Sequence, residues 1–250
     1  MPKKAVSFSK GIFLQNAMDY DQTKRYLISV GGSLVVPNGI DTDFVRRFHD
    51  CITTRIREGY SFILVVGGGK TARNYIDAAS AVRAIEHDDQ DWLGIHATRM
   101  NAHFLRTIFR EWAHPRINTN PHDLEDFYRA KEPILVAGGW RPGFSTDYIA
   151  TVLGKYLGFR TILNLSNTDG VYDSDPRKNP EAKRFDCLSW QEFRTLIGDS
   201  WSPGMNTPFD PVASTLAEKE GFSVIVMNGS DIDNLERYFS GKDFIGTTIR

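Results

Sequence analysis

The sequence predicts an α/β fold with a mostly parallel central sheet. Segments that are apolar and rich in β-branched residues alternate along the chain with segments of helical period, the order expected for parallel strands joined by helices. Residues 61–66 (SFILVV) are apolar almost throughout, as a strand is when helices cover both faces of its sheet. Ligands of such folds bind beyond the carboxyl ends of the strands, so the loops there are the candidate site.

The first strand and helix are predicted between residues 25 and 59. Residues 25–35 (RYLISVGGSLV) begin as a strand and pass into a pair of glycines. Residues 41–59 have helical period, with Asp41 as a suitable N-cap and Gly59 as the residue beyond the end. The glycine pair therefore lies between a strand and a helix.

A second strand leads to a glycine triplet and then to two helices. Strand 61–66 is followed by the triplet 67–69, and a helix is predicted from about Thr71. Residues 91–113 place apolar side chains at helical spacing, which predicts a long helix that Asp91 opens.

The second half of the chain continues the alternation. Its predicted strands cover 132–140, 160–167, 222–229 and 246–250, and its predicted helices cover 145–158, 211–221 and 231–241. Ser145 or Thr146 can cap the first of these helices through its hydroxyl group. A long loop rich in Asp, Pro and Lys is predicted after residue 167.

Four of the predicted strands end in loops suited to ligand binding. These loops are 31–33, 67–69, 138–139 and 165–176 (LSNTDGVYDSDP). Single glycines commonly mark α/β turns, but paired glycines after three strands exceed what a turn requires. The sequence therefore predicts one composite site at the carboxyl edge of the sheet.

The stretch VVGGGKTAR around the triplet can be interpreted in three ways. A Walker A loop would need a glycine at position 64, where Leu64 lies inside the predicted strand, so this interpretation fails. A dinucleotide fingerprint would need an acidic residue at the end of a second strand about 20 residues later. Glu86 and Asp88 are near that distance, but their surroundings are too polar for a buried strand.

The third interpretation is a helix N-terminus that binds a phosphate through its free N–H groups and the positive end of its dipole. Lys70 and Arg73 lie in the first turn of the predicted helix, where the dipole disfavours cations unless an anion offsets them. A turn without a ligand would need one glycine rather than three. Phosphate binding is therefore the prediction for this stretch.

Composition and charge restrict the function. The chain has 250 residues, of which 24% are charged, and a formal net charge of −1, so it has no general basic field for nucleic acid or an acidic membrane. Its two cysteines, Cys51 and Cys187, are too few for a disulfide framework or a metal cluster. No apolar run reaches the ~20 residues of a membrane span, and the N-terminus is a poor secretory signal, so a soluble cytoplasmic protein is expected.

Four motifs occur in a characteristic order and spacing: SVGGS, VVGGGKTAR, AGGWRPGFSTD and NTDGVYDSDP. Together with the terminal GKDFIGTTIR they resemble the amino acid kinase superfamily, and within it the archaeal type of uridylate kinase. The resemblance begins at about residue 26, so residues 25–250 are predicted to form one amino acid kinase domain and residues 1–24 an arm outside it. It implies a three-layer αβα sandwich, phosphorylation of UMP to UDP with ATP and Mg²⁺ in pyrimidine nucleotide biosynthesis, and a homohexamer.

The resemblance also implies roles for individual residues. The expected catalytic residues are Arg73 and Lys70. The expected UMP-binding residues are Gly68, Asp91, Trp140, Arg141, Pro142, Gly143, Phe144, Ser145 and Thr146. The expected ATP-binding residues are Gly32, Ser33, Gly69, Arg73, Ser166, Asn167, Tyr172 and Asp175. No protein ligand is implied for Mg²⁺, which the nucleotide phosphates mainly hold.

One position departs from the superfamily. Many members have a lysine two residues before the first glycine pair, where this chain has Ser29. Positive charge at the transfer point must then come from Lys70, Arg73, Arg141 or Mg²⁺. Arg73 is preferred because it lies one helical turn past the triplet, and a guanidinium can grip a phosphoryl group with two parallel hydrogen bonds.

Three other functions remain as alternatives. A kinase of another acceptor, such as an isoprenoid phosphate, usually has a histidine soon after its glycine triplet, where this chain has Lys70, Thr71 and Ala72. A non-catalytic relative that binds nucleotides and stores oxoanions uses clustered histidines, but the six histidines here are scattered. A dinucleotide-dependent oxidoreductase depends on the fingerprint interpretation, which the polar surroundings of Glu86 weaken.

Overall fold

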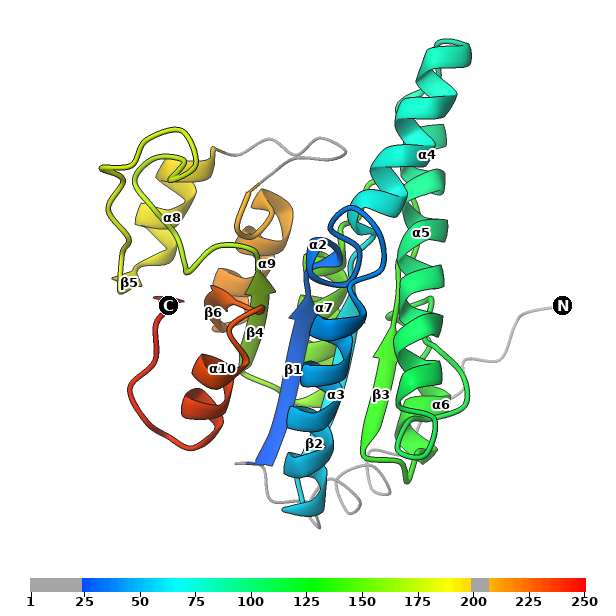
Figure 1. Cartoon of the computed structure of the whole chain (residues 1–250), viewed down its shortest axis with the longest axis vertical. Coiled ribbons are helices and arrows are strands. Elements are labelled where there is room, and N and C mark those ends of the chain that lie inside the picture. The colour runs from blue at the N-terminus through cyan, green and yellow to red at the C-terminus, as the bar shows by residue number, and fades with distance from the viewer. Residues whose placement is uncertain (1–23, 199–206) are drawn as a thin grey trace, which may run out of the picture.

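The computed structural model describes residues 24–198 and 207–250, in which a seven-stranded sheet lies between two layers of helices (Figure 1). The predicted arm, residues 1–24, lies outside the described residues apart from Lys24. The strands are β1 (Arg25–Val30), β2 (Ser61–Val66), β3 (Ile134–Ala137), β4 (Thr161–Ser166), β5 (Cys187–Leu188), β6 (Ser223–Asn228) and β7 (Thr247–Ile249). Their order is β3-β2-β1-β4-β6-β7-β5, and every neighbouring pair is parallel except β6 and β7, which confirms a mostly parallel sheet.

Helices cover both faces of the sheet. One face packs against α3 (Thr42–Arg57), α5 (His87–Ile108) and α10 (Ile232–Phe239), and the other against α7 (Thr146–Leu157), α8 (Trp190–Ile197) and α9 (Pro211–Lys219). Successive strand residues alternate between the two cores: Ile28 and Val30 of β1 belong to the first core and Leu27 to the second. Strands buried on both faces explain why the predicted strand segments are apolar almost throughout.

Three short helices and one short strand were not predicted. They are α2 (Gly32–Val35), α6 (Glu125–Arg129), α8 and β5. The prediction of an unbroken loop after residue 167 is therefore wrong over β5 and α8. A sequence signal for α8 does exist, because Ser189 and Glu192 form a capping box at its start.

Two helices begin earlier than predicted. Helix α4 (Gly69–Val82) starts at Gly69 rather than Thr71, since glycine tolerates the positive φ of 60° found there. Helix α5 starts at His87 rather than Asp91, because the acidic residues Asp88 and Asp89 suit the positive end of the helix dipole. Helix α4 buries none of its residues, and together with the first half of α5 it extends beyond the sheet (Figure 1).

Candidate active site

The strand order reverses between β1 and β4. From β1 the sheet continues through β2 to β3 on one side, and from β4 through β6 on the other. The N–H of Gly31 donates to the carbonyl oxygen of Leu165 at 2.9 Å, which joins the loop after β1 to the end of β4. In α/β proteins ligands bind beyond the carboxyl ends of the strands at such a reversal. The predicted loops after β1 and β4 lie there, and the glycine triplet after β2 touches Gly32 beside them.

The glycine loops after β1 and β2 are in direct main-chain contact. A Cβ atom at Gly32 would lie 2.1 Å from the nitrogen of Gly69, and one at Gly67 would lie 2.6 Å from the nitrogen of Gly32. The Gly67 N–H also donates to the carbonyl oxygen of Val30 at 2.9 Å. This packing by itself requires several glycines, so the argument that a ligand-free turn would need only one is wrong.

The first turn of α4 supplies better support for an anion site. Among the described residues, no atom accepts a hydrogen bond from the N–H of Gly68 or of Gly69, whereas the N–H of Lys70 is bonded to the carbonyl oxygen of Val36 at 2.9 Å. Unpaired N–H groups at the positive end of a helix dipole are the groups that bind a phosphate.

The two predicted catalytic cations flank this turn. Lys70 is half-buried and Arg73 is exposed on α4, and the side chain of neither forms a hydrogen bond or ion pair within residues 24–198 and 207–250. Both charges are therefore available to a ligand. The reach of the Arg73 guanidinium back to the turn stays a prediction. Ser33, predicted to contact ATP, is half-buried in α2 beside the same turn.

The predicted acceptor loop, residues 140–146, is tied to α5 through Asp91. Its Oδ2 atom accepts a hydrogen bond from the N–H of Gly143 at 2.7 Å. Asp91 thus lies one turn inside the helix with its carboxylate on the loop, and the expectation that it opens the helix is wrong. The Arg141 guanidinium lies 4.1 Å from the ring centroid of Trp140 and 5.0 Å from that of Phe144. The loop thus carries a guanidinium packed against two aromatic rings.

Pro142 and Ser145 complete the acceptor loop. Pro142 is half-buried in it. Ser145 is the N-cap of α7, since its hydroxyl accepts from the N–H of Tyr148 at 3.0 Å, and Thr146 is the first helical residue. Of the two residues predicted as possible caps, Ser145 is confirmed. Its hydroxyl also donates to Asp210, which ties the loop to the start of α9.

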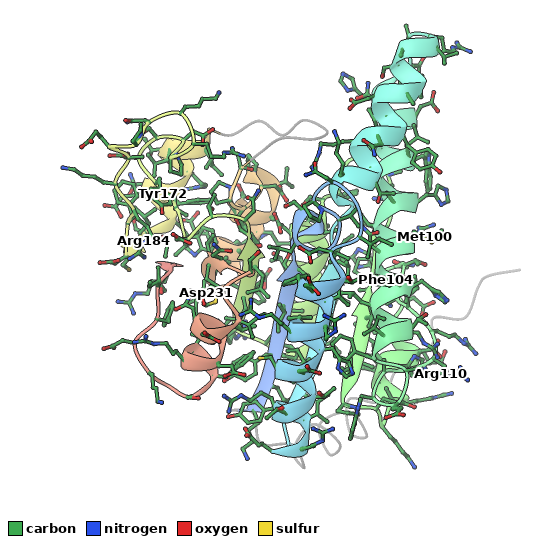
Figure 2. All side chains as sticks on the ribbon, viewed as in Figure 1. Met100, Phe104, Arg110, Tyr172, Arg184 and Asp231 are labelled. Carbon is green, nitrogen blue, oxygen red and sulfur yellow. The ribbon has the colours of Figure 1, made fainter. Side chains whose placement is uncertain are left out.

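Ser166, Asn167, Tyr172 and Asp175, predicted to bind ATP, lie at the end of β4 and in the loop after it. Ser166 Oγ lies 3.1 Å from the hydroxyl oxygen of Thr168, and Asn167 is exposed. Tyr172 and Arg184 form an isolated antiparallel bridge, and Figure 2 shows both on the flank opposite α5. Ser166, Asn167, Tyr172 and Asp175 thus lie on the β4 side of the strand reversal, whereas loop 140–146 lies on the β2–β3 side; Gly69 and Arg73, also predicted to bind ATP, follow β2.

Asp175 is already engaged by Arg177, a residue that the sequence did not single out. Nε and Nη2 of Arg177 donate to the two carboxylate oxygens of Asp175 at 3.0 and 3.1 Å. These hydrogen bonds hold the pKa of Asp175 below its usual range. A nucleoside hydroxyl would have to share the carboxylate with this guanidinium or displace it.

Sequence reasoning missed a pair of carboxyl groups, Asp147 and Asp210, at the starts of α7 and α9. Ser29 Oγ donates to Asp147 Oδ1 at 3.1 Å, and the N–H of Asp210 donates to Asp147 Oδ2 at 3.3 Å. Burial raises the pKa of Asp147 to about 7, with the neighbouring Asp210 contributing, and burial likewise raises the pKa of Asp210. The residue that stands in place of the superfamily's lysine is thus bonded to a carboxyl group that tends toward its neutral form.

As the pH rises, the Asp147→Asn variant is expected to lose less thermal stability than the wild-type protein. Because its folded pKa is raised from 3.8 to about 7, Asp147 stabilises the fold at low pH, and this contribution is lost as the pH rises through about 7. The shift corresponds to about 4 kcal/mol at most. Wild type should lose thermal stability relative to Asp147→Asn between about pH 4 and about pH 7, with little further loss above that range. Asp88→Asn, at an exposed position, is the control, and parallel pH profiles for wild type and Asp147→Asn would contradict the assignment.

Comparison with known proteins places the chain in a family. The model of the amino acid kinase family matches residues 24–228. The uridylate kinase of Pyrococcus abyssi is 36% identical over 226 residues, covering 90% of this chain and 99% of that protein. The uridylate kinase of Methanospirillum hungatei is 37% identical over 226 residues, covering 89% of this chain and 93% of that protein.

Solved structures agree with the sequence relatives. The crystal structure of uridylate kinase from Archaeoglobus fulgidus matches with a TM-score of 0.74 at 30% identity, covering 91% of this chain and 100% of that one. The UMP kinase of Ureaplasma parvum shares the fold, with a TM-score of 0.71 at 22% identity, covering 90% of this chain and 98% of that one. The chain therefore belongs to the amino acid kinase family, in which it groups with the uridylate kinases of archaea.

Proposed function

We propose that this protein is a nucleoside monophosphate kinase that transfers the γ-phosphoryl group of ATP to UMP, giving ADP and UDP in pyrimidine nucleotide biosynthesis. The observation that carries the proposal is the main-chain contact between the turns after β1 and β2, flanked by the acceptor loop and the loop after β4. Two phosphate-binding turns in contact can hold two phosphate chains end to end, as phosphoryl transfer requires. The relatives named uridylate kinase support UMP as the acceptor.

UMP is assigned to the side of the strand reversal formed by β2, β3 and α5. The N–H of Gly68 is the proposed donor to its phosphate. Asp91 uses Oδ2 on the N–H of Gly143, which leaves Oδ1 for a ribose hydroxyl. The uridine part is assigned to the loop formed by Trp140, Arg141, Pro142, Gly143, Phe144, Ser145 and Thr146, whose aromatic rings can stack on a base.

ATP is assigned to the turns after β1 and β2 for its phosphates and to the loop after β4 for its nucleoside. The proposed contacts to its phosphates are Gly32, Ser33, Gly69 and Arg73, and the proposed contacts to its nucleoside are Ser166, Asn167, Tyr172 and Asp175. Lys70 and Arg73 would meet the charge that develops on the transferred phosphoryl group. No nucleophilic side chain is needed, because positioning and charge neutralisation account for catalysis of this type.

We expect Mg²⁺ to enter with ATP and to be held mainly by its phosphates. In the described part of the chain, no three His, Cys, Asp or Glu side chains converge as metal ligands. Mg²⁺ commonly binds through substrate phosphates with few protein ligands. When bound, the ion supplies positive charge to the phosphate oxygens, while the N–H groups of the two turns orient them.

We expect the enzyme to act in the cytoplasm as a homohexamer, as its grouping with archaeal uridylate kinases suggests. Its partners would be ATP, UMP and further copies of itself, without nucleic acid or membrane. Over residues 24–198 and 207–250, no helix has both the length and the apolar character to cross a bilayer.

A coupled assay of ADP release with a panel of acceptors tests the proposal. UMP with Mg-ATP should be turned over well above AMP and GMP, because the acceptor loop beside Asp91 is assigned to the uridine part of the acceptor. Equal turnover of purine and pyrimidine monophosphates would contradict the assignment. Turnover of an isoprenoid phosphate instead of UMP would favour the alternative kinase, and absence of turnover with any acceptor would favour a non-catalytic relative.

Asp91→Ala is expected to raise the KM for UMP by about tenfold, roughly the free energy of one hydrogen bond to a charged group, and to leave the KM for ATP nearly unchanged. The change removes both the proposed ribose contact and the observed bond to the acceptor loop. Tyr172→Ala and Asp175→Ala should instead raise the KM for ATP and leave the KM for UMP nearly unchanged. Steady-state kinetics with each substrate varied separately decide this, with the exposed Asp89→Ala as the matched control on α5. Equal changes for both substrates would contradict the assignment.

A further inference from the structure

Helix α5 contacts two loops of the proposed site through side chains within one helical turn. Thr98 and Asn101 are buried and Arg99 is half-buried. Met100, between them in sequence, is 67% exposed and lies on the outer side of the helix, as Figure 2 shows. The inner face of this turn of α5 therefore packs against the two loops of the proposed site.

Asn101 holds the glycine turn after β2. Its Nδ2 atom donates to the carbonyl oxygens of Gly67 and Gly68 at 2.9 and 3.0 Å. Only the NH₂ group of the amide can donate hydrogen bonds to two carbonyl oxygens, so these partners fix the orientation of the Asn101 side-chain amide.

The consequence for the turn follows from peptide geometry. In a trans peptide the C=O and the N–H of one plane point in opposite directions. Holding the carbonyl oxygens of Gly67 and Gly68 toward α5 therefore directs the N–H groups of Gly68 and Gly69 away from it. These are the same two N–H groups that have no acceptor among the described residues.

Arg99 holds the start of the acceptor loop in a similar way. Its Nε and Nη2 atoms donate to the carbonyl oxygens of Gly139 and Trp140 at 2.9 and 2.8 Å. Thr98 Oγ1 accepts from the N–H of Gly139 at 2.6 Å, and a Cβ atom at Gly139 would lie 2.7 Å from that oxygen. The planar guanidinium suits two successive carbonyl groups as a lysine would not.

We propose that Asn101 and Arg99 are positioning residues through which α5 sets the acceptor loop and the phosphate turn relative to each other. The proposal rests on the proposed function. Asn101 acts on both nucleotides, because it orients the N–H of Gly68 toward the UMP phosphate and that of Gly69 toward the ATP phosphates. Arg99 acts on UMP alone, through the loop that begins at Trp140.

The two residues should give different kinetic signatures. Asn101→Ala is expected to lower kcat about 10-fold to 30-fold, because small displacements of bound phosphates slow transfer strongly. The near-isosteric Asn101→Asp should lower kcat at least as much, since it places oxygen against two carbonyl oxygens. Arg99→Met should raise the KM for UMP about tenfold and leave the KM for ATP within about twofold, and Arg99→Lys should recover only part of the loss.

A matched control separates positioning from a merely structural role. Asn234 on α10 is 4% exposed, as is Asn101, and its Nδ2 donates to the carbonyl oxygen of Ile245 at 2.7 Å. Asn234→Asp should lower the Tm and leave kcat and both KM values nearly unchanged. The rise in Tm on adding saturating UMP or ATP is the second readout, because it depends on the bound state. It should shrink in the Asn101 variants and persist in Asn234→Asp.

The outcomes are distinguishable. If wild type phosphorylates UMP while Asn101→Ala keeps kcat and the ligand-induced rise in Tm within about twofold, the positioning role is overturned. If wild type does not phosphorylate UMP, the proposed function fails. The rise in Tm with ATP, assigned to the N–H of Gly69, then still decides the role of Asn101: loss in Asn101→Ala but not in Asn234→Asp supports it, and equal rises overturn it.

Discussion

Replacement of Arg73 by alanine is expected to lower kcat by at least about 100-fold, roughly 3 kcal/mol of transition-state stabilisation, with smaller changes in KM. A phosphoryl group in transfer carries charge on its equatorial oxygens, which fixed positive groups or metal must meet. Ser29, where many superfamily members have lysine, is 3% exposed and uncharged, so it cannot meet that charge. Arg73 lies one turn into α4, and its guanidinium has no partner among the described residues, so it is available to a ligand.

Two further variants sharpen this prediction. Arg73→Lys should recover only part of the rate, because a point charge cannot make the two parallel hydrogen bonds of a guanidinium. Arg83→Ala, at the exposed far end of the same helix, should leave kcat unchanged. The measurement is steady-state kinetics of folded variants at saturating Mg²⁺. If Arg73→Ala keeps near-full kcat, the charge comes from Lys70 or the metal ion alone, and the proposed mechanism of the turn is wrong.

A charge restored at position 29 provides an independent test. In the Arg73→Ala background, Ser29→Lys should recover some rate, since it places a cation at the position where many members of the superfamily have lysine. The hydrogen bond from Ser29 to Asp147 shows that the new ammonium group would meet a carboxyl group there. That pairing would lower the pKa of Asp147 and give the lysine a fixed position. A double variant as slow as Arg73→Ala would show that charge at this position does not substitute for Arg73.

Features with local causes could be predicted from the sequence. Asp41 and Ser145 cap their helices with side chains that reach N–H groups three residues ahead, so a short window contains both partners. The parallel strands followed from their apolar composition. The glycine turns were found at the correct strand ends, although the main-chain contact between Gly32 and Gly69 could not be seen.

Features that depend on contacts between distant segments could not be predicted. Asp147 and Asp210 each look like an ordinary acidic residue at a helix start, and their pairing exists only because α7 and α9 pack together with their N-termini at one place. Asn101 looks like one polar residue in a long amphipathic helix. Its role became visible only when the fold brought the carbonyl oxygens of Gly67 and Gly68 against it.

Gly32→Ala is expected to be among the most damaging small substitutions in the described part of the chain. The added Cβ would lie 2.1 Å from the nitrogen of Gly69 and 2.6 Å from the carbonyl oxygen of Gly67, and both are main-chain atoms that cannot rotate away. Relief requires the two turns to separate, which disturbs the hydrogen bonds between them and moves the two proposed phosphate sites apart. We expect a loss of at least about 3 kcal/mol in the free energy of unfolding, or about 6 °C or more in Tm, and a loss of at least about 100-fold in kcat/KM.

Gly39→Ala is the matched control for this effect. Gly39 follows the same turn, but a Cβ atom there would meet nothing within 4 Å, and the φ of Gly39 is not positive. The control should therefore keep Tm within about 2 °C, because an alanine compatible with its backbone costs little. Thermal unfolding and steady-state kinetics on both variants give the comparison, and failure of Gly32→Ala to fold would agree with the prediction. A Gly32→Ala protein with wild-type Tm and kcat/KM would mean that the turns after β1 and β2 can separate freely, and that their contact does not set the distance between the two nucleotides.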